Sequence, residues 1–150
     1  MGTIVIDTEV IASAAKSNYE AFALLIEIEK RKNVLLGVDS DYIILKEYRT
    51  HIESHKSNDL IRIWFKKIYN RLYFKSLTQR GPYPDTNMSE VDKACLDRAA
   101  ISDTKILVSE DSDFYSDKTL SAPHPEVQRR KVKLLKIREA AREIENLEDP

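Results

Sequence analysis

The chain has 150 residues, of which 42% are hydrophobic and 33% are charged, and its 24 Lys and Arg against 25 Asp and Glu leave a net charge of −1. This composition is typical of one globular domain with its own apolar core, and the charge balance argues against a general polyanion-binding protein. A single cysteine and three glycines exclude an internal disulfide, a cysteine-based zinc cluster and a glycine-rich phosphate loop.

We expect neither a membrane span nor a secretory signal. No apolar run reaches the roughly 18 residues expected of a membrane span, and the N-terminal residues lack the basic region and cleavage site of a secretory signal. Together with the single cysteine, these features predict a cytoplasmic protein.

Three short apolar segments have the composition of strands that are buried on both faces. They are residues 3–6, 34–38 and 106–108. Elsewhere apolar residues recur every three or four positions, as in amphipathic helices. The predicted helices cover about residues 21–31, 40–48, 58–72, 89–100 and 126–147. The predicted N-caps are Asp39 or Ser40, then Asn58 and Ser89.

Strands that are separated by helices of this length predict an α/β fold. We expect a three-layer α/β/α sandwich with a central, mainly parallel sheet. Residues 1–122 would form this domain, and residues 123–150 a C-terminal helical extension, because the pattern becomes continuously helical after Pro125.

Acidic residues follow two of the predicted strands. Asp7 comes directly after the first, and the sequence from Ser109 to Asp113 follows the third. Because the carboxyl ends of parallel strands meet at one edge of a sheet, we expect Asp7 and Asp111 to lie close together. Crowded carboxylates repel each other, and Mg²⁺ or Mn²⁺ would neutralise them. The alternative is that both residues serve as caps of the helix or turn that follows.

Four segments stand in a characteristic order along the chain: Ile4–Thr8, Ile43–Tyr48, Val91–Leu96 and Ile106–Phe114. In this order and spacing they resemble the motifs of PIN-domain nucleases. The last segment is also similar to that of NYN nucleases, which belong to the same superfamily. The resemblance extends over about residues 3–114 and implies a PIN-like fold.

The resemblance further implies an acidic site that binds one or two Mg²⁺ or Mn²⁺ ions. Its expected catalytic and metal-binding residues are Asp7, Glu47, Asp92 and Asp111, with Asp113 as a fifth metal ligand. Two features depart from the family pattern. Glu9 stands where the family usually has Asn, and Asp97 is an alternative to Asp92, since the two lie five residues apart on one helix and face different directions.

Such a site would hydrolyse phosphodiesters, and the resemblance favours a ribonuclease that acts as the toxin of a toxin–antitoxin pair. Its expected nucleic-acid partner is then RNA in preference to DNA. The other expected partners are a protein antitoxin and a second copy of the chain. Two other functions stay open. The domain could be a catalytically inactive PIN-like scaffold, which Glu9 would favour, or a metal-dependent phosphatase for small molecules.

A basic stretch is a candidate for binding the substrate. Lys66, Lys67, Arg71 and Lys75 alternate with Tyr69, Tyr73 and Phe74, and cations beside aromatic rings suit a single-stranded nucleic acid. The alternative is a helix with a basic outer face and core aromatics. A second basic stretch, residues 128–138, is either a solvated helix face, a phosphate-binding arm or a dimer contact. Ser109 and Ser112 lack the His and Asp partners of a serine nucleophile.

Overall fold

A computed structural model describes residues 2–54, 56–75 and 88–147, without the side chains of residues 73–75. Within these residues the strands form one five-stranded sheet in the order β3-β2-β1-β4-β5, and all four pairs of neighbours are parallel. The strands are β1 (Gly2–Ile6), β2 (Val34–Asp39), β3 (Leu72–Lys75), β4 (Ile106–Val108) and β5 (Lys133–Leu135). The expected α/β fold with a parallel sheet is confirmed.

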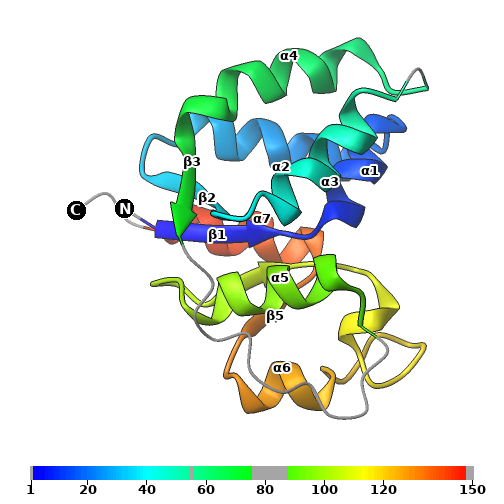
Figure 1. Cartoon of the computed structure of the whole chain (residues 1–150), viewed down its shortest axis with the longest axis vertical. Coiled ribbons are helices and arrows are strands. Elements are labelled where there is room, and N and C mark those ends of the chain that lie inside the picture. Colours follow the sequence, from blue (N-terminus) through cyan, green and yellow to red (C-terminus); the bar gives the residue numbers. More distant parts are fainter. Residues whose placement is uncertain (1, 55, 76–87, 148–150) are drawn as a thin grey trace.

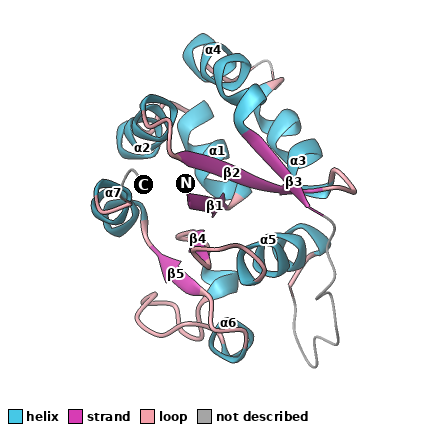
Figure 2. Cartoon of the chain, turned by 90° about the vertical axis from the view of Figure 1, so that its left-hand side faces the viewer, coloured by secondary structure: helices cyan, strands magenta, loops and turns pink. Residues whose placement is uncertain are grey.

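Helices cover both faces of this sheet (Figure 1 and Figure 2). They are α1 (Thr8–Ala15), α2 (Tyr19–Lys30), α3 (Ile43–Ile52), α4 (Asp59–Ile68), α5 (Glu90–Ala100), α6 (Pro125–Arg129) and α7 (Ile137–Glu145). Helix α5 packs across β1, β2 and β4, while α2 lies on the opposite face with α7 beside it (Figure 2). Among the described residues, no helix combines the length and apolar character needed to cross a bilayer.

The three central strands are the apolar segments that the sequence analysis identified. Residues 4–6, 106–108 and most of 34–38 are buried, as expected for strands covered on both faces. The predicted caps are also confirmed. Asn58 accepts a hydrogen bond from the backbone N–H of Ile61 at 2.9 Å, and Ser89 accepts one from Asp92 at 3.1 Å. Helix α3 begins later than expected, at Ile43, with Tyr42 at its N-cap position. The side chain of Asp39 still accepts from the backbone N–H groups of Ile43 and Ile44, at 3.1 and 2.9 Å.

The helix predicted over residues 58–72 ends earlier. Helix α4 stops at Ile68, a 3₁₀ turn follows at Tyr69–Arg71, and Leu72 begins strand β3, where it lies opposite Leu36 of β2. Leu72 continues the four-residue apolar spacing of α4, so its periodicity predicts a helix. Leu72 is instead in a strand, because pairing of β3 with β2 satisfies backbone hydrogen-bonding groups of β2.

The single long helix predicted over residues 126–147 is wrong. The chain forms α6, then β5, then α7. Lys131 has a positive φ of 58°, which a continuous helix does not allow. Leu134 and Leu135 then pair with Leu107 and Val108 at the edge of the sheet. The segment after residue 122 therefore contributes a strand as well as a helix.

Candidate acidic metal site

The candidate site lies at the carboxyl ends of the neighbouring strands β1 and β4. Strands β1 and β4 are neighbours, with Ile6 opposite Val108, and the backbone N–H of Asp7 donates to the carbonyl of Val108 at 2.9 Å. This pairing brings Asp7, which follows β1, next to Ser109, which follows β4. Residues about 100 positions apart in the sequence thus meet where parallel strands usually bind ligands.

Asp7 is completely buried and is held by a serine. Its Oδ2 accepts a hydrogen bond from Ser109 Oγ at 2.7 Å, and Ser109 Oγ in turn accepts from the backbone N–H of Asp111 at 3.0 Å. Asp7 Oδ1 is buried without a hydrogen-bond partner. Although Asp7 stands at the N-cap position of α1, its side chain makes no capping hydrogen bond. Asp7 therefore occupies the cap position of α1, but its side chain does not serve as the cap.

Three further carboxylates converge beside Asp7. One oxygen from each of Asp92, Asp111 and Asp113 lies within 4.8 Å of the others. The Ser89 cap places Asp92 in the first turn of α5, while the turn after β4 supplies the other two. Asp111 does act as a cap, because its Oδ1 accepts from the backbone N–H of Asp113 at 3.0 Å, but this occupies only one of its oxygens.

The geometry of this group suits a small divalent cation. Oxygen ligands on opposite sides of Mg²⁺ are about 4 Å apart, twice the usual Mg–O distance, so small side-chain rotations would close the group around an ion. The N-termini of α1 and α5 both face this edge, and their partial positive charge favours anionic groups here.

Burial and mutual repulsion shift the proton affinities of the acidic residues. Burial, with a smaller contribution from the charges of Asp92 and Asp111, raises the pKa of Asp7 to about 8, although the hydrogen bond from Ser109 lowers it. The pKa of Asp92 rises to about 7, mainly through burial and then through the charge of Asp111. Without a cation, the folded protein therefore holds protons on these carboxyl groups near neutral pH.

Asp92 and Asp97 have different environments. Asp92 belongs to the group of three carboxylates, whereas Asp97 is fully buried and forms an ion pair with Arg130 at 3.3 Å. Arg130 also lies 3.4 Å from Glu126 of α6. Asp97 thus joins α5 to α6, and its charge is balanced within the protein. Of the two alternatives, the geometry favours Asp92 as the acidic residue of the site.

Glu47 is not part of the group. Its Oε1 lies 3.7 Å from His51 Nε2, one turn further along α3. His51 lines a small hollow of about 80 Å³ with Ala12 and Lys16 of α1. Because residues four apart share a helix face, Glu47 lies on the side of α3 that faces α1. In the described structure Glu47 contacts His51. Its role as a metal ligand stays a prediction.

Glu9 lies beside the group in the first turn of α1. Its Oε1 accepts a hydrogen bond from Ser13 Oγ at 3.2 Å, and the backbone of Glu110 also forms a hydrogen bond with its carboxylate. Burial raises the pKa of Glu9, and the nearby charges of Glu110 and Asp111 add to this effect. Glu9 is therefore only partly exposed to solvent.

Arg71, which was predicted to bind substrate, makes its contacts within the protein. Its guanidinium donates to the carbonyls of Ile28 at 3.0 Å and Val34 at 2.7 Å, and also to those of Glu29 and Arg31. These carbonyls belong to the end of α2 and the turn that leads into β2. Arg71 therefore stabilises a helix terminus, and its donors are used inside the protein.

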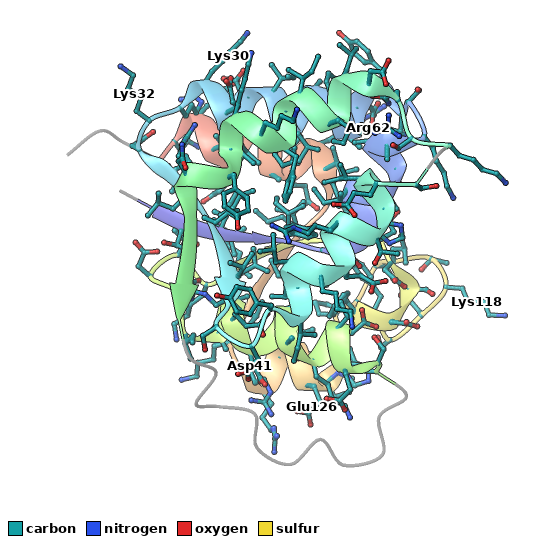
Figure 3. The ribbon with its side chains drawn as sticks, turned by 45° about the horizontal axis from the view of Figure 1, so that its top comes forward. Lys30, Lys32, Asp41, Arg62, Lys118 and Glu126 are labelled. Atoms are coloured by element: carbon teal, nitrogen blue, oxygen red, sulfur yellow. The ribbon has the colours of Figure 1, made fainter. Side chains whose placement is uncertain are left out.

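The other predicted cations lie at different edges of the sheet. Lys66 and Lys67 are exposed in the last turn of α4, just before the amino end of β3, and so lie at the edge opposite the acidic group. Lys75 ends β3 at the same edge as Asp7, but its side chain falls outside the described residues. Figure 3 shows Lys30 and Lys32 at one end of the molecule and Lys118 at the other, in the loop that follows Asp113.

The second basic stretch is mostly paired within the protein. Arg138 contacts Glu20 of α2 at 2.7 Å, Lys133 contacts Glu143 at 2.6 Å, and Arg130 joins Asp97. These contacts link β5 and α7 to the rest of the fold. They support a structural role for this stretch over a phosphate-binding arm.

Ser109 is the functional residue that the sequence analysis missed. The sequence offers Ser109 no His and Asp partners for a nucleophile, whereas in the structure its hydroxyl donates to Asp7 Oδ2 and accepts from the backbone N–H of Asp111. The available signal was its position directly after β4, since a polar residue at this point meets the end of the neighbouring parallel strand.

Comparisons with known proteins found no protein-family model, no curated protein and no solved structure that matches the chain.

Proposed function

We propose that the protein is a Mg²⁺- or Mn²⁺-dependent nuclease, and that RNA is its preferred substrate. The observation that carries the proposal is the convergence of Asp92, Asp111 and Asp113 beside the buried Asp7 at the carboxyl edge of a parallel sheet. The order of the four segments that resemble PIN-domain nucleases supports the choice of reaction. The roles as a toxin, the antitoxin partner, the homodimer and the cytoplasmic location stay predictions from the sequence.

The donor set fits a hard divalent cation. All the converging ligands are carboxylate oxygens, which Mg²⁺ and Mn²⁺ prefer, and neither sulfur nor imidazole is part of the group. A buried carboxylate oxygen without a partner, such as Asp7 Oδ1, is costly unless something else neutralises it. Bound divalent ions would supply charge neutralisation at a phosphodiester and a lower pKa for the attacking water.

The residues of the chain have distinct tasks in this proposal. Asp92, Asp111 and Asp113 bind the cation, and Ser109 orients Asp7 beside them through its hydrogen bond. Because Asp7 and Asp92 have raised pKa values, they release protons when the cation binds, so metal affinity should increase with pH between about 6 and 8.

The test is cleavage of labelled single-stranded RNA and DNA in Mn²⁺, Mg²⁺ or EDTA. We expect metal-dependent cleavage of RNA that Asp111→Asn lowers at least about 100-fold. This variant keeps an oxygen that can cap the backbone of Asp113, so it should fold. Asp41→Asn, which changes an exposed aspartate in the loop after β2, is the matched control and should keep full activity.

A metal-dependent phosphatase is the second candidate, and the placement of the cations favours it. Arg71 is engaged inside the protein, and Lys66 and Lys67 lie at the opposite edge, so three of the four residues expected to bind a polynucleotide do not reach the acidic group. Hydrolysis of p-nitrophenyl phosphate without cleavage of either nucleic acid would establish this function. Metal binding without any hydrolysis would identify an inactive scaffold.

A further inference from the structure

Lys136 directly follows strand β5 at the same edge of the sheet as the acidic group. The last residues of β1, β4 and β5 lie opposite one another, so Asp7, Ser109 and Lys136 form the next row across these strands. The backbone N–H of Ser109 donates to the carbonyl of Leu135 at 3.0 Å, just as that of Asp7 donates to Val108 at 2.9 Å. Neighbouring strands are about 5 Å apart, so the backbone of Lys136 lies about 10 Å from that of Asp7 along this row.

The row also fixes the face of the sheet from which the side chain of Lys136 projects. Side chains at opposite positions of neighbouring strands point to the same face. The side chains of Asp7 and Ser109 do so, because they form a hydrogen bond of 2.7 Å. Lys136 has an extended backbone, with φ −77° and ψ 166°, so it continues β5 by one residue. Its side chain therefore leaves the sheet on the face of Asp7 and Ser109.

Unlike several other cations of the second basic stretch, Lys136 has no acidic partner. Arg130, Lys133 and Arg138 all form ion pairs. Within the described part of the chain, the ammonium of Lys136 makes no ion pair, and none of its N–H donors has an acceptor. It lies 6.0 Å from the centroid of the Tyr115 ring, at the outer limit of a cation–π contact. Its three N–H donors are thus available to a ligand.

The contacts of Lys136 hold it beside the site. Lys136 is half-buried, and its backbone N–H donates to Glu139 in the first turn of α7 at 3.0 Å. Tyr115, whose ring lies beside the ammonium, is itself buried, and its hydroxyl donates to the carbonyl of Ser109 at 3.0 Å. A partly buried cation without a partner is unfavourable, and an anion bound at this position would compensate for it.

We propose that Lys136 binds a phosphate group of the substrate beside the acidic group, and that in a polynucleotide this is a backbone phosphate. The inference rests on the proposed function, because it requires a substrate that carries phosphate. All the converging side chains of the site are carboxylates, and a phosphate brings further negative charge. A lysine in the same row supplies positive charge from the protein itself to an oxygen of the phosphate.

Lys136 supplies the cation that the first basic stretch does not bring to this edge. Lys66 and Lys67 lie at the opposite edge, and Arg71 is engaged inside the protein. Lysine suits this task, because its flexible stem brings a compact charge to a phosphate oxygen without demanding a fixed geometry. The substrate is then held between Lys136 and the acidic group.

The test is the affinity of labelled single-stranded RNA in Mg²⁺, measured by fluorescence anisotropy at several salt concentrations. All proteins carry Asp111→Asn, which suppresses cleavage. Lys136→Met keeps the apolar stem and removes the charge. It should weaken binding about 10-fold and make the dependence of log affinity on log salt shallower by about 0.7. Lys136→Arg keeps the charge and should restore the affinity to within about 3-fold. Lys133→Met, at the amino end of the same strand, is the matched control and should bind as before.

The outcomes separate this inference from the proposed function. Unchanged affinity and salt dependence in Lys136→Met would overturn the inference, while cleavage of RNA by the wild-type protein would leave the nuclease proposal standing. An equal loss in Lys136→Arg would show that packing against Tyr115 matters and the charge does not, which also overturns the inference. Absence of both RNA binding and hydrolysis would contradict both proposals.

A small-molecule substrate gives a different result. If the wild-type protein hydrolyses only p-nitrophenyl phosphate, and Lys136→Met raises the KM for this compound, the bound phosphate belongs to a small molecule and the assignment to a polynucleotide backbone is wrong. Thermal unfolding of each variant in EDTA establishes that it is folded.

Discussion

Asp7 is an acidic side chain with no exposed surface, and its protonation controls the stability of the metal-free protein. Its pKa lies at about 8 in the folded state, against 3.8 for an ordinary aspartate. Between these values the folded protein binds more protons than the unfolded chain. Its free energy of unfolding therefore falls as the pH rises from about 4 to 8, and Asp92 acts in the same direction.

We predict that Asp7→Asn removes much of this pH dependence. In EDTA the wild-type protein should melt at a lower temperature at pH 8 than at pH 5, because deprotonation leaves an unbalanced buried charge. The melting temperature of the variant should fall less between pH 5 and pH 8. At pH 8 it should exceed that of the wild type by roughly 5 °C or more. Thermal unfolding by circular dichroism at the two pH values measures this.

Excess Mn²⁺ provides the complementary observation. It should raise the melting temperature of the wild-type protein at pH 8 more than that of Asp7→Asn, because the ion replaces the displaced protons. An identical pH dependence in the two proteins would contradict the role assigned to Asp7.

The acidic residues of the site were predictable because each follows or begins an element that the sequence marks clearly. Asp7 ends the apolar run of β1, and Asp92 follows the Ser89 cap. Their partners were not predictable in the same way. Ser109 and Arg130 acquire their roles from contacts with Asp7 and Asp97 that only the folded chain creates.

At the scale of elements, the end of α2 depends on a side chain from another part of the chain. Helix C-termini leave carbonyls without intrahelical partners, and here the guanidinium of Arg71 satisfies several of them. Arg71 directly precedes β3, so its hydrogen bonds connect the α2–β2 turn to the edge strand of the sheet.

We predict that Arg71→Ala lowers the free energy of unfolding by about 2–3 kcal/mol, because buried carbonyls lose a charged donor. Lys67→Ala, four residues earlier and exposed, is the matched control and should change stability by less than about 0.5 kcal/mol. Urea unfolding measures both. Equal stability of the two variants would show that the Arg71 contacts contribute little.

Helical periodicity led to the errors at this scale. Leu72 continues the spacing of α4, and Leu134, Leu135 and Ile137 fit a helix that would run through residues 126–147. Both β3 and β5 lie at the edges of the sheet, and each continues the apolar spacing of a neighbouring helix, so periodicity alone does not distinguish them from helices. Their strand character comes from pairing with β2 and β4.

At the scale of the whole molecule, the C-terminal segment closes the fold. Strand β5 pairs with β4, and α7 packs on α2. Near the end of the described chain, the carbonyl of Leu147 accepts from Asn33 Nδ2 at 2.5 Å, and Leu147 lies beside Gly2. The C-terminal residues thus contact the beginning of β1 and the turn before β2.

We predict that a chain ending at residue 122 does not fold cooperatively. It would lose β5 and α7, which exposes the edge of β4 and the apolar face of α2. A chain ending at residue 147 is the control and should keep the melting temperature of the full-length protein. Circular dichroism and amide dispersion in NMR spectra measure the difference, and a cooperative transition in the shorter chain would contradict the prediction.

The link between Asp7 and Ser109 spans 102 residues of sequence. During synthesis Asp7 leaves the ribosome 102 residues before Ser109, and Asp111 follows shortly after. A growing polypeptide therefore has no complete acidic group until β4 has been translated and has taken its place beside β1. Whatever chemistry the group supports can therefore begin only after two segments made far apart in time have come together in one sheet.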